Sequence, residues 1–314
     1  MAILKRSKVF LLAKIESTYG TDPVPVAGDA IETRQLDWTP YDGNRVQNVI
    51  DRATLGGYSD INTGPNVGVT FQVGMQGAGG AVDDVPAYGA LLRACGLAQT
   101  INASTSVEYD PVSAAFESIT GYLFNDGMRQ VALGMRGNLT GQMARGQLPT
   151  FGFAMRGLYA QPTTPAAVTP DITDFFAPIP VTKVNTPTIS ILGYTGAQLE
   201  SFSFDFQNEV VYRNTTNLEE VLINNRNVVG QLVLAAPDLA TKNFFSDVES
   251  HAALTTGALQ IIHGTAAGKV VQFDAPAVQL ASIARGEADG LTTYTFDLRF
   301  LPSSGDDEFK ITTK

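Results

Sequence analysis

Few residues in this sequence of 314 could carry out catalysis. The two histidines, His251 and His263, have no cysteine or second histidine at the spacing of metal ligands, which a zinc site requires. They form no Ser/His/Asp order, and GYTGA lacks the serine of a nucleophile elbow. We therefore interpret both histidines as surface or capping residues and expect no catalytic residue.

Paired carboxylates are the other group that could do chemistry. They stand at Asp83-Asp84, Glu219-Glu220 and Asp306-Asp307, where calcium binding or two-carboxylate catalysis would need such oxygens. None has the alternating acidic spacing and following glycine of an EF-hand loop, and the cluster GMQGAGGA lacks the lysine of a P-loop. The sequence predicts solvated charge and turns here, with no metal and no cofactor.

Composition indicates a folded, mostly β protein. Hydrophobic residues make up 44% and charged residues 17%, with 30 glycines, which favours a buried core joined by strands and turns. The lone Cys95 in AYGALLRACGL is expected to be a buried thiol. The run VFLLA is too short for a secretory signal, and no stretch approaches the roughly 20 apolar residues of a membrane span. We expect a protein made in a cytoplasm, without a membrane partner.

The chain divides by composition into five segments. They are an N-terminal arm over residues 1–30, a first β domain over 31–159, a linker with six prolines over 160–187, a second β domain over 188–302, and a tail over 303–314. The arm and the tail are expected either to become ordered on assembly or to be simply frayed ends. In the linker, Phe175, Phe176 and Ile179 are expected to pin the chain to a neighbouring surface.

The two β domains share a pattern, which predicts an internal duplication. LDWTPYDGNRVQNVIDR corresponds to LESFSFDFQNEVVYR, VGVTFQVGM to VVGQLVLAA, and both domains close with a long hairpin. Each has a short helix. VPAYGALLRAC is predicted to bury Val85, Tyr88, Leu91, Leu92 and Cys95, and DLATKNFFSDVESHAAL to bury Leu239, Phe244, Phe245 and Val248.

Three segments resemble a known family. LLAKIESTYGTDPVPVAGDAI, GQLPTFGFAMRGLY and TISILGYTGAQLESFSFDFQNEVVYR are similar to segments of the major tail tube proteins of phages with long non-contractile tails. The resemblance implies two tandem β-sandwich or barrel-like domains, each with one short flanking helix and a long loop. It also implies a structural virion protein, assembled in the bacterial host cytoplasm, whose stacked rings of three copies form a pseudo-six-fold tube that delivers DNA.

Partners follow from the same resemblance. They are further copies of the chain, a tape-measure protein, a tail terminator and a distal tail protein, with DNA passing through the lumen without specific binding. The formal charge of −10 disfavours a grip on the phosphate backbone, and we hypothesise a neutral to acidic bore.

Two irregular stretches, GGYSDINTGPN and NTTNLEEVLINNRN, are long for β-sandwich connections, and long loops of this kind are either functional or mobile surface. We hypothesise contacts between rings. The residues are Gly57, Tyr58, Asp60, Asn62, Asn66, Asn217, Glu219, Glu220, Asn224 and Arg226.

Two other classes of function stay open on the sequence alone. A secreted or surface carbohydrate-binding β-sandwich would share the composition and the charge, but it needs exposed aromatic platforms and only one tryptophan, Trp38, is present. A hydrolase on a β scaffold would need a convergent acid, base or metal group.

Overall fold

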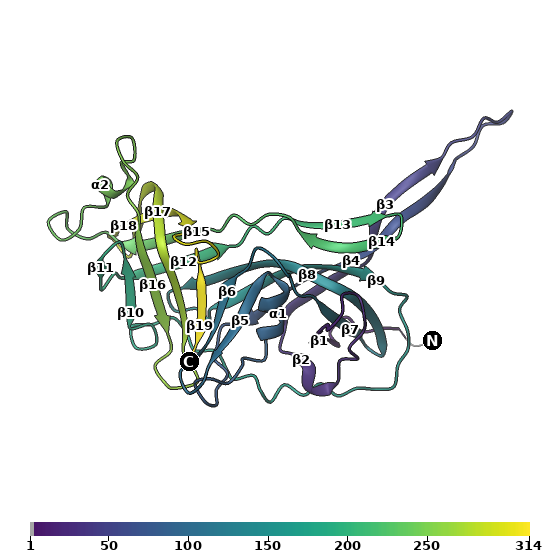
Figure 1. The fold of residues 1–314 in the computed structure, drawn as a ribbon, viewed down its shortest axis with the longest axis horizontal. Coiled ribbons are helices and arrows are strands. Elements are labelled where there is room, and N and C mark those ends of the chain that lie inside the picture. Colours follow the sequence, from purple (N-terminus) through teal and green to yellow (C-terminus); the bar gives the residue numbers. More distant parts are fainter. Residues whose placement is uncertain (1–2) are drawn as a thin grey trace.

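The computed structural model describes residues 3–314, and its fold is mainly β, as predicted (Figure 1). The strands of the first half are β1 Val9–Ile15, β2 Ala30–Ile31, β3 Arg34–Asn48, β4 Ser59–Gly74, β5 Leu97–Asn102, β6 Ser106–Pro111, β7 Ile119–Asn125, β8 Met128–Ala144 and β9 Thr150–Tyr159. Those of the second half are β10 Thr188–Ile191, β11 Tyr194–Thr195, β12 Leu199–Asp205, β13 Val210–Thr215, β14 Leu218–Ile223, β15 Val229–Ala235, β16 Gly257–His263, β17 Val271–Ala288, β18 Leu291–Leu301 and β19 Lys310–Thr313.

One antiparallel layer runs through both halves of the chain. Pairing gives the order β3-β4-β9-β8-β12-β15-β18-β17. The first four strands come from the first half and the last four from the second half. In each half, a pair of strands that continues into a long hairpin extension (β3-β4, β12-β15) lies beside the closing hairpin (β8-β9, β17-β18).

Two long strands turn the corner between this layer and the layer behind it. The amino-terminal part of β8 pairs with β7, which pairs with β1, while the amino-terminal part of β17 pairs with β16 and β19. Each strand has a bulge where it changes layer, at Leu133/Arg136 in β8 and at Leu280/Ser282 in β17. Bulges bend a strand in this way and let it serve two sheets.

The core lies between these layers and crosses the boundary between the halves. Strict alternation along β12 and into the residue that follows it buries Phe202, Phe204 and Phe206. The ring of Phe204 lies 4.6 Å from that of Phe309 and 5.5 Å from that of Phe273, measured between centroids. Aromatic contacts at these separations stabilise a core beyond the area that they bury.

Both predicted helices are present but shorter than the sequence pattern indicates. Helix α1 is Gly89–Ala94, with Leu91, Leu92 and the C-cap residue Cys95 buried, and burial raises the pKa of the Cys95 thiol. Helix α2 is Phe244–Val248, and a short 3-10 turn covers Ala27–Asp29. The predicted buried stripe of the second helix is wrong in part.

Only Phe244 of that stripe is fully buried, whereas Leu239 is 58% and Phe245 43% exposed. The helix has barely more than one turn, so positions at helical spacing do not share a face over the predicted length. Val85, predicted to be buried in the first helix, precedes α1 and is also exposed.

The carboxyl-terminal segment is ordered within one chain, so the expectation that it orders on assembly is wrong for its last strand. Strand β19 pairs with β6 of the first half and with β17 of the second. Phe309 and Ile311 are fully buried. Within the segment 1–30, strand β1 pairs along its whole length with β7, and Leu11 and Leu12 are buried.

His263 fastens the proline-rich segment 160–187 to the second half. Its Nε2 lies 3.1 Å from the Ile179 carbonyl and its Nδ1 2.8 Å from Thr186 Oγ1. The side chain is buried, contrary to the surface or capping role expected from the sequence, and burial lowers the pKa of its imidazole. A neutral ring satisfies this site, donating from Nε2 to the carbonyl and accepting from the threonine at Nδ1.

Candidate assembly surfaces

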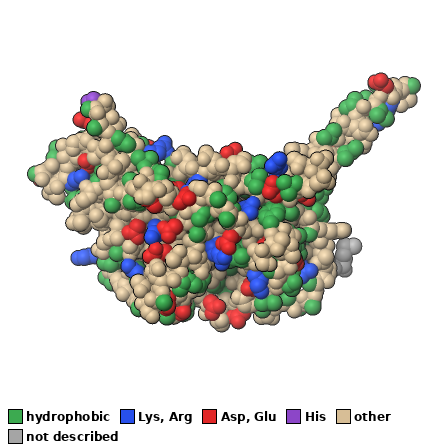
Figure 2. Space-filling model, viewed as in Figure 1, with side chains coloured by type: hydrophobic (Ala, Val, Ile, Leu, Met, Phe, Trp, Pro, Cys, Tyr) green, Lys and Arg blue, Asp and Glu red, His purple; other side chains and the backbone are tan. Residues whose placement is uncertain are grey.

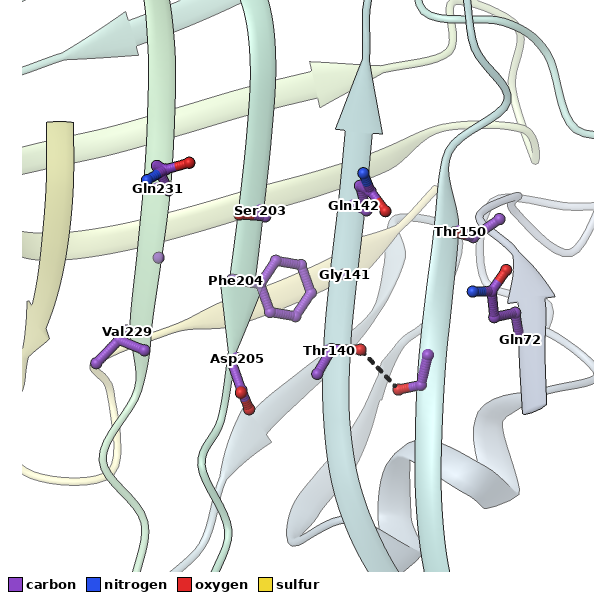
Figure 3. A pocket seen from close by; sticks show the side chains of 12 residues that line it. Gln72, Thr140, Gly141, Gln142, Thr150, Ser203, Phe204, Asp205, Val229 and Gln231 are labelled. Carbon is purple, nitrogen blue, oxygen red and sulfur yellow. Dashed lines mark hydrogen bonds between the residues drawn. The ribbon is translucent and has the colours of Figure 1, made fainter. Parts of the chain in front are cut away.

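The face of the continuous layer that points away from the core is polar. Figure 3 shows side chains from adjacent strands on it, and Thr140 Oγ1 donates to the Gly152 carbonyl at 3.3 Å. The residues lining its central hollow include Gln72, Thr140, Gln142, Thr150, Ser203, Asp205 and Gln231. They alternate with the buried core residues, so the sequence periodicity that fills the core also produces this face.

Charges on this face are sparse and mixed. Asp205 accepts from Asn138 Nδ2 at 2.7 Å, and Asp297 accepts from Ser282 Oγ at 2.6 Å and from Gln231 Nε2 at 3.3 Å. The hydrogen bond from Ser282, and after it that from Gln231, lowers the pKa of Asp297, so its carboxylate stays ionised. Arg299, opposite Gln279 on β17, supplies positive charge nearby. Arg156 on β9 lines an adjoining hollow together with Asp37 and Asp42, so positive and negative side chains are interspersed.

The two halves join through a ladder between β8 and β12. It runs from Ser201 opposite Ala144 to Asp205 opposite Thr140. Gly141 makes this junction tight, because a Cβ there would come 2.2 Å from the Phe204 ring. The junction therefore has both backbone pairing and a packed core.

The two outer edges of the same layer have no partner within the described chain. Strand β3 pairs only with β4, and β17 beyond its bulge pairs only with β18. Leu36, Trp38 and Ile283 lie half-buried at these edges, packed against the core on one side. An edge of this kind is a template for pairing with another chain.

The hairpin β3-β4 extends far beyond the body of the molecule (Figure 1). We call its outer part, residues 41–66, arm 1. Val46 and Ile61 face each other across its strands, and they are 55% and 54% exposed. Figure 2 shows hydrophobic side chains along this projection. An exposed apolar pair on a lone two-stranded ribbon indicates a surface that needs a partner.

The corresponding hairpin of the second half lies along the body instead. We call its outer part, β13-β14 over residues 210–223, arm 2. Val221 is fully buried and Ile223 is 7% exposed. Arg136 Nη1 donates to the Val221 carbonyl at 2.7 Å, and the Val221 amide donates to the Tyr19 hydroxyl at 2.5 Å. Arm 2 is thus bound to the first half of its own chain.

Arg226 anchors the base of arm 2. Its guanidinium donates to Glu308 at 2.6 Å, to Asp306 at 3.0 Å and to the Val112 carbonyl at 2.8 Å. Its side chain is 11% and that of Glu308 10% exposed. The predicted contact residue Arg226 is therefore already used inside the chain.

The other residues predicted to make contacts divide between the two arms. Gly57, Tyr58, Asp60 and Asn62 are exposed on arm 1, Asn217 and Glu219 lie exposed at the turn of arm 2, and Asn224 is exposed at its base, whereas Glu220 is partly buried and Asn66 fully buried. The stretches expected to be irregular are largely strands of these hairpins. Two further features, the half-buried edge residue Ile283 and the pair Val46–Ile61, were not predicted from the sequence. The signal for the pair was its apolar side chains within the polar stretch between 44 and 63.

Residues 3–314 contain no group of three or more His, Cys, Asp or Glu residues placed to hold a metal ion. Over the same residues, no helix is both long and apolar enough to cross a bilayer.

A family model of the phage tail tube protein matches residues 6–300, nearly the whole chain. The chain belongs to the phage tail tube protein family. The family expected from the sequence is thereby confirmed, and the chain is a structural component of a phage tail. None of the curated proteins matches. In a tail tube protein, the two open edges of the layer and the exposed arm 1 are candidate surfaces for assembly.

Proposed function

We propose that three copies of this tail tube protein close into a ring, and that rings stack into the hollow tube through which phage DNA is delivered. The observation that carries the proposal is the ladder between β8 and β12, which joins the last strand of one half-layer to the first strand of the other. The two open edges have the same relation to each other. Strand β17 is the last strand that the second half contributes to the layer, and β3 is the first strand that the first half contributes.

A neighbouring copy can therefore repeat the internal junction. Its β17 would lie along β3, covering Leu36 and Trp38 as β8 covers Phe202 and Phe204. Repeated head to tail, this contact closes by rotation into a ring. The equivalent strand order in the two halves supports a duplicated domain, so a ring of three chains would hold six similar domains.

The polar face of the continuous layer would then line the bore. Its threonine, serine and glutamine side chains carry no positive charge, and the acidic side chains of Asp205 and Asp297 repel phosphate. Attraction multiplied over many rings would trap DNA, whereas this surface lets it slide. Tight, salt-sensitive binding of DNA inside assembled tubes would contradict this assignment.

Stacking would use the exposed ends of the arms, including Gly57, Tyr58 and Asn217. Stacked rings present an open contact at each end of the tube, where a tail terminator and a distal tail protein would bind, and a tape-measure protein would fill the bore before DNA. Assembly in the bacterial host cytoplasm belongs to the same proposal. The carbohydrate-binding alternative gains no support, because Trp38 is partly buried at the sheet edge.

Electron microscopy of the purified, concentrated chain tests the proposal. We expect rings and tubes from the unaltered protein. Ile283→Lys puts a charge on the open edge of β17 and should abolish both while leaving a folded monomer. Val184→Lys, at an exposed position of the linker, is the matched control and should assemble normally. Dispersed monomers of the unaltered chain at every concentration would overturn the proposal.

A further inference from the structure

Arm 2 shows how a hairpin of this fold is seated on the neighbouring domain. It leaves the layer at β12 and β15, crosses the adjacent strands β8 and β9, and packs beside the end of α1. Ile223 Cδ1 would lie 3.6 Å from a Cβ at Gly96, just after that helix, and Asn208 Nδ2 donates to the Cys95 carbonyl at 2.7 Å. The seat is formed by α1, the residues that follow it, and the bulged strand beside it.

The second half carries the same set of elements without a hairpin on it. Along the chain, helix α2 follows β15 and precedes β16, just as α1 follows β4 and precedes β5. Strand β17 has a bulge, as β8 does. The flank formed by α2 and the following residues exposes apolar side chains, with Phe245 43% and Leu254 54% exposed. Exposed apolar area is thus available on both surfaces, from Val46 and Ile61 on arm 1 and from Phe245 and Leu254 on this flank.

Direction makes the two surfaces compatible. In Figure 1, arm 2 runs from the second half over the first, and arm 1 leaves the far side of the first half, with α2 at the opposite end of the molecule. A copy whose β17 lies along β3 would place its α2 flank next to arm 1. The internal junction supports this placement, because β12 beside β8 brings arm 2 onto the α1 flank of the first half.

We infer that arm 1 binds the α2 flank of the adjacent copy in the same ring, as arm 2 binds the α1 flank within its own chain. Val46 and Ile61 take the place of the cross-strand pair Tyr212–Val221, and Phe245 and Leu254 supply the apolar seat. The occupant of this flank is a second copy of the chain. The inference rests on the proposed ring, and it assigns the base of arm 1 to a contact within the ring while the tip stays free for the next ring.

Cross-linking with introduced cysteines tests the inference. The native Cys95 is fully buried, so Ile61→Cys and Leu254→Cys together provide the reactive thiols. A short bismaleimide applied to assembled tubes should give a covalent product limited to three chains on a denaturing gel, because contacts within a closed ring return to the first chain. Either single cysteine variant should give no such product.

Gln47→Cys with Leu254→Cys is the matched control. Gln47 neighbours Val46 on the same strand, so its side chain points to the opposite face of arm 1. It should cross-link at least tenfold less. A ladder extending beyond three chains would show that arm 1 binds the next ring at this site, and would overturn the inference.

Tubes visible by electron microscopy without any cross-link would also overturn the inference while leaving the proposed function standing. Failure of the unaltered chain to form rings or tubes would instead remove the proposed function itself. A second measurement guards against a local effect of cysteine: Leu254→Asp should raise the protein concentration needed for assembly at least tenfold. An unchanged concentration for assembly of Leu254→Asp would likewise contradict the inference that arm 1 binds the α2 flank.

Discussion

The two arms of this chain start from equivalent positions of one layer and end in opposite situations. Arm 1 continues the ladder of β3 and β4 into solvent, with irregularities between Thr39 and Asn44, whereas arm 2 bends away from β12 and β15 and lies on the first half. Both have an apolar cross-strand pair. Val221 in arm 2 is fully buried, while Val46 and Ile61 in arm 1 are more than half exposed.

The bend of arm 2 is fixed by polar residues that arm 1 lacks. Asn208 donates to the Cys95 and Gly137 carbonyls, and Arg226 binds Glu308 and Asp306 at the opposite strand of the hairpin. A hairpin whose base is bound to its own chain serves that chain's stability. Arm 1 touches its own chain near its base, where Tyr41 packs on Tyr159 and Gly64 lies beside Tyr212, while its exposed Val46 and Ile61 stay available for another copy.

Removal of the Arg226 charge should have the largest effect on this comparison. Arg226→Met leaves the buried Glu308 carboxylate without its partner and should cost about 3–5 kcal/mol of unfolding free energy. Arg213→Met is the control, because its contact with Glu220 is exposed at the arginine and such pairs contribute about 0–1 kcal/mol. Urea denaturation measures both, and equal losses would contradict the anchoring role.

Truncation of the apolar pair should affect the two arms differently. Val221→Ala creates a cavity in a fully buried site and should destabilise the monomer by about 2 kcal/mol. Ile61→Ala removes more carbon from an exposed site, so the monomer should change by less than about 0.5 kcal/mol while assembly weakens. Urea denaturation under non-assembling conditions and an assembly titration separate the effects. Equal destabilisation of the monomer by both would contradict the difference between the arms.

Hydrogen exchange should report the bond between arm 2 and the first half. In the unassembled chain, amides of β13 and β14 should exchange more slowly than those of residues 49–58. Tyr19→Phe removes the acceptor of the Val221 amide, which should cost about 1–2 kcal/mol and speed exchange across residues 218–223. Arm 1 should not respond. Unchanged exchange at Val221 would show that the tyrosine does not hold arm 2.

Acid should destabilise the contacts at the base of arm 2, and this is the smallest of the expected effects. The hydrogen bond from Ser113, together with Arg226, lowers the pKa of Asp306. A carboxylate with a lowered folded pKa stabilises the fold above its unfolded pKa of about 3.9, and the contribution is lost as pH falls through the folded pKa. Asp306→Asn should therefore lower the urea midpoint at pH 6, and the difference from the unaltered chain should shrink below about pH 4. A gap that stays constant would contradict this coupling.

Much of the fold could be predicted because alternation determines it. Phe202, Phe204 and Phe206 alternate with polar residues, and that pattern requires a strand with one buried face. The short helices were harder, since Leu239 and Phe245 have helical spacing but lie in a segment that makes little more than one turn. The order of strands across the layer depends on contacts between distant segments, such as Phe204 against Gly141, which periodicity does not contain.

The assembly surfaces were predictable only in part. Tyr58 and Asp60 stand out in a long polar stretch and are exposed on arm 1, so composition located that arm. Arg226 looked equally polar in the sequence, yet its partners Asp306 and Glu308 lie 80 and 82 residues away, and only folding brings them together. The open edge at Ile283 had no local signal, because an edge is defined by the strand that is absent from its side.

The central claim is that the two open edges of the layer repeat the internal junction between copies. A cryo-electron microscopy map of the assembled chain tests it directly. The account predicts three chains per ring, with β17 of one chain hydrogen-bonded along β3 of the next and the polar face around Thr140 and Gln231 lining the bore. A ring in which β3 or β17 faces solvent, or in which the polar face lies on the outside of the tube, would contradict it.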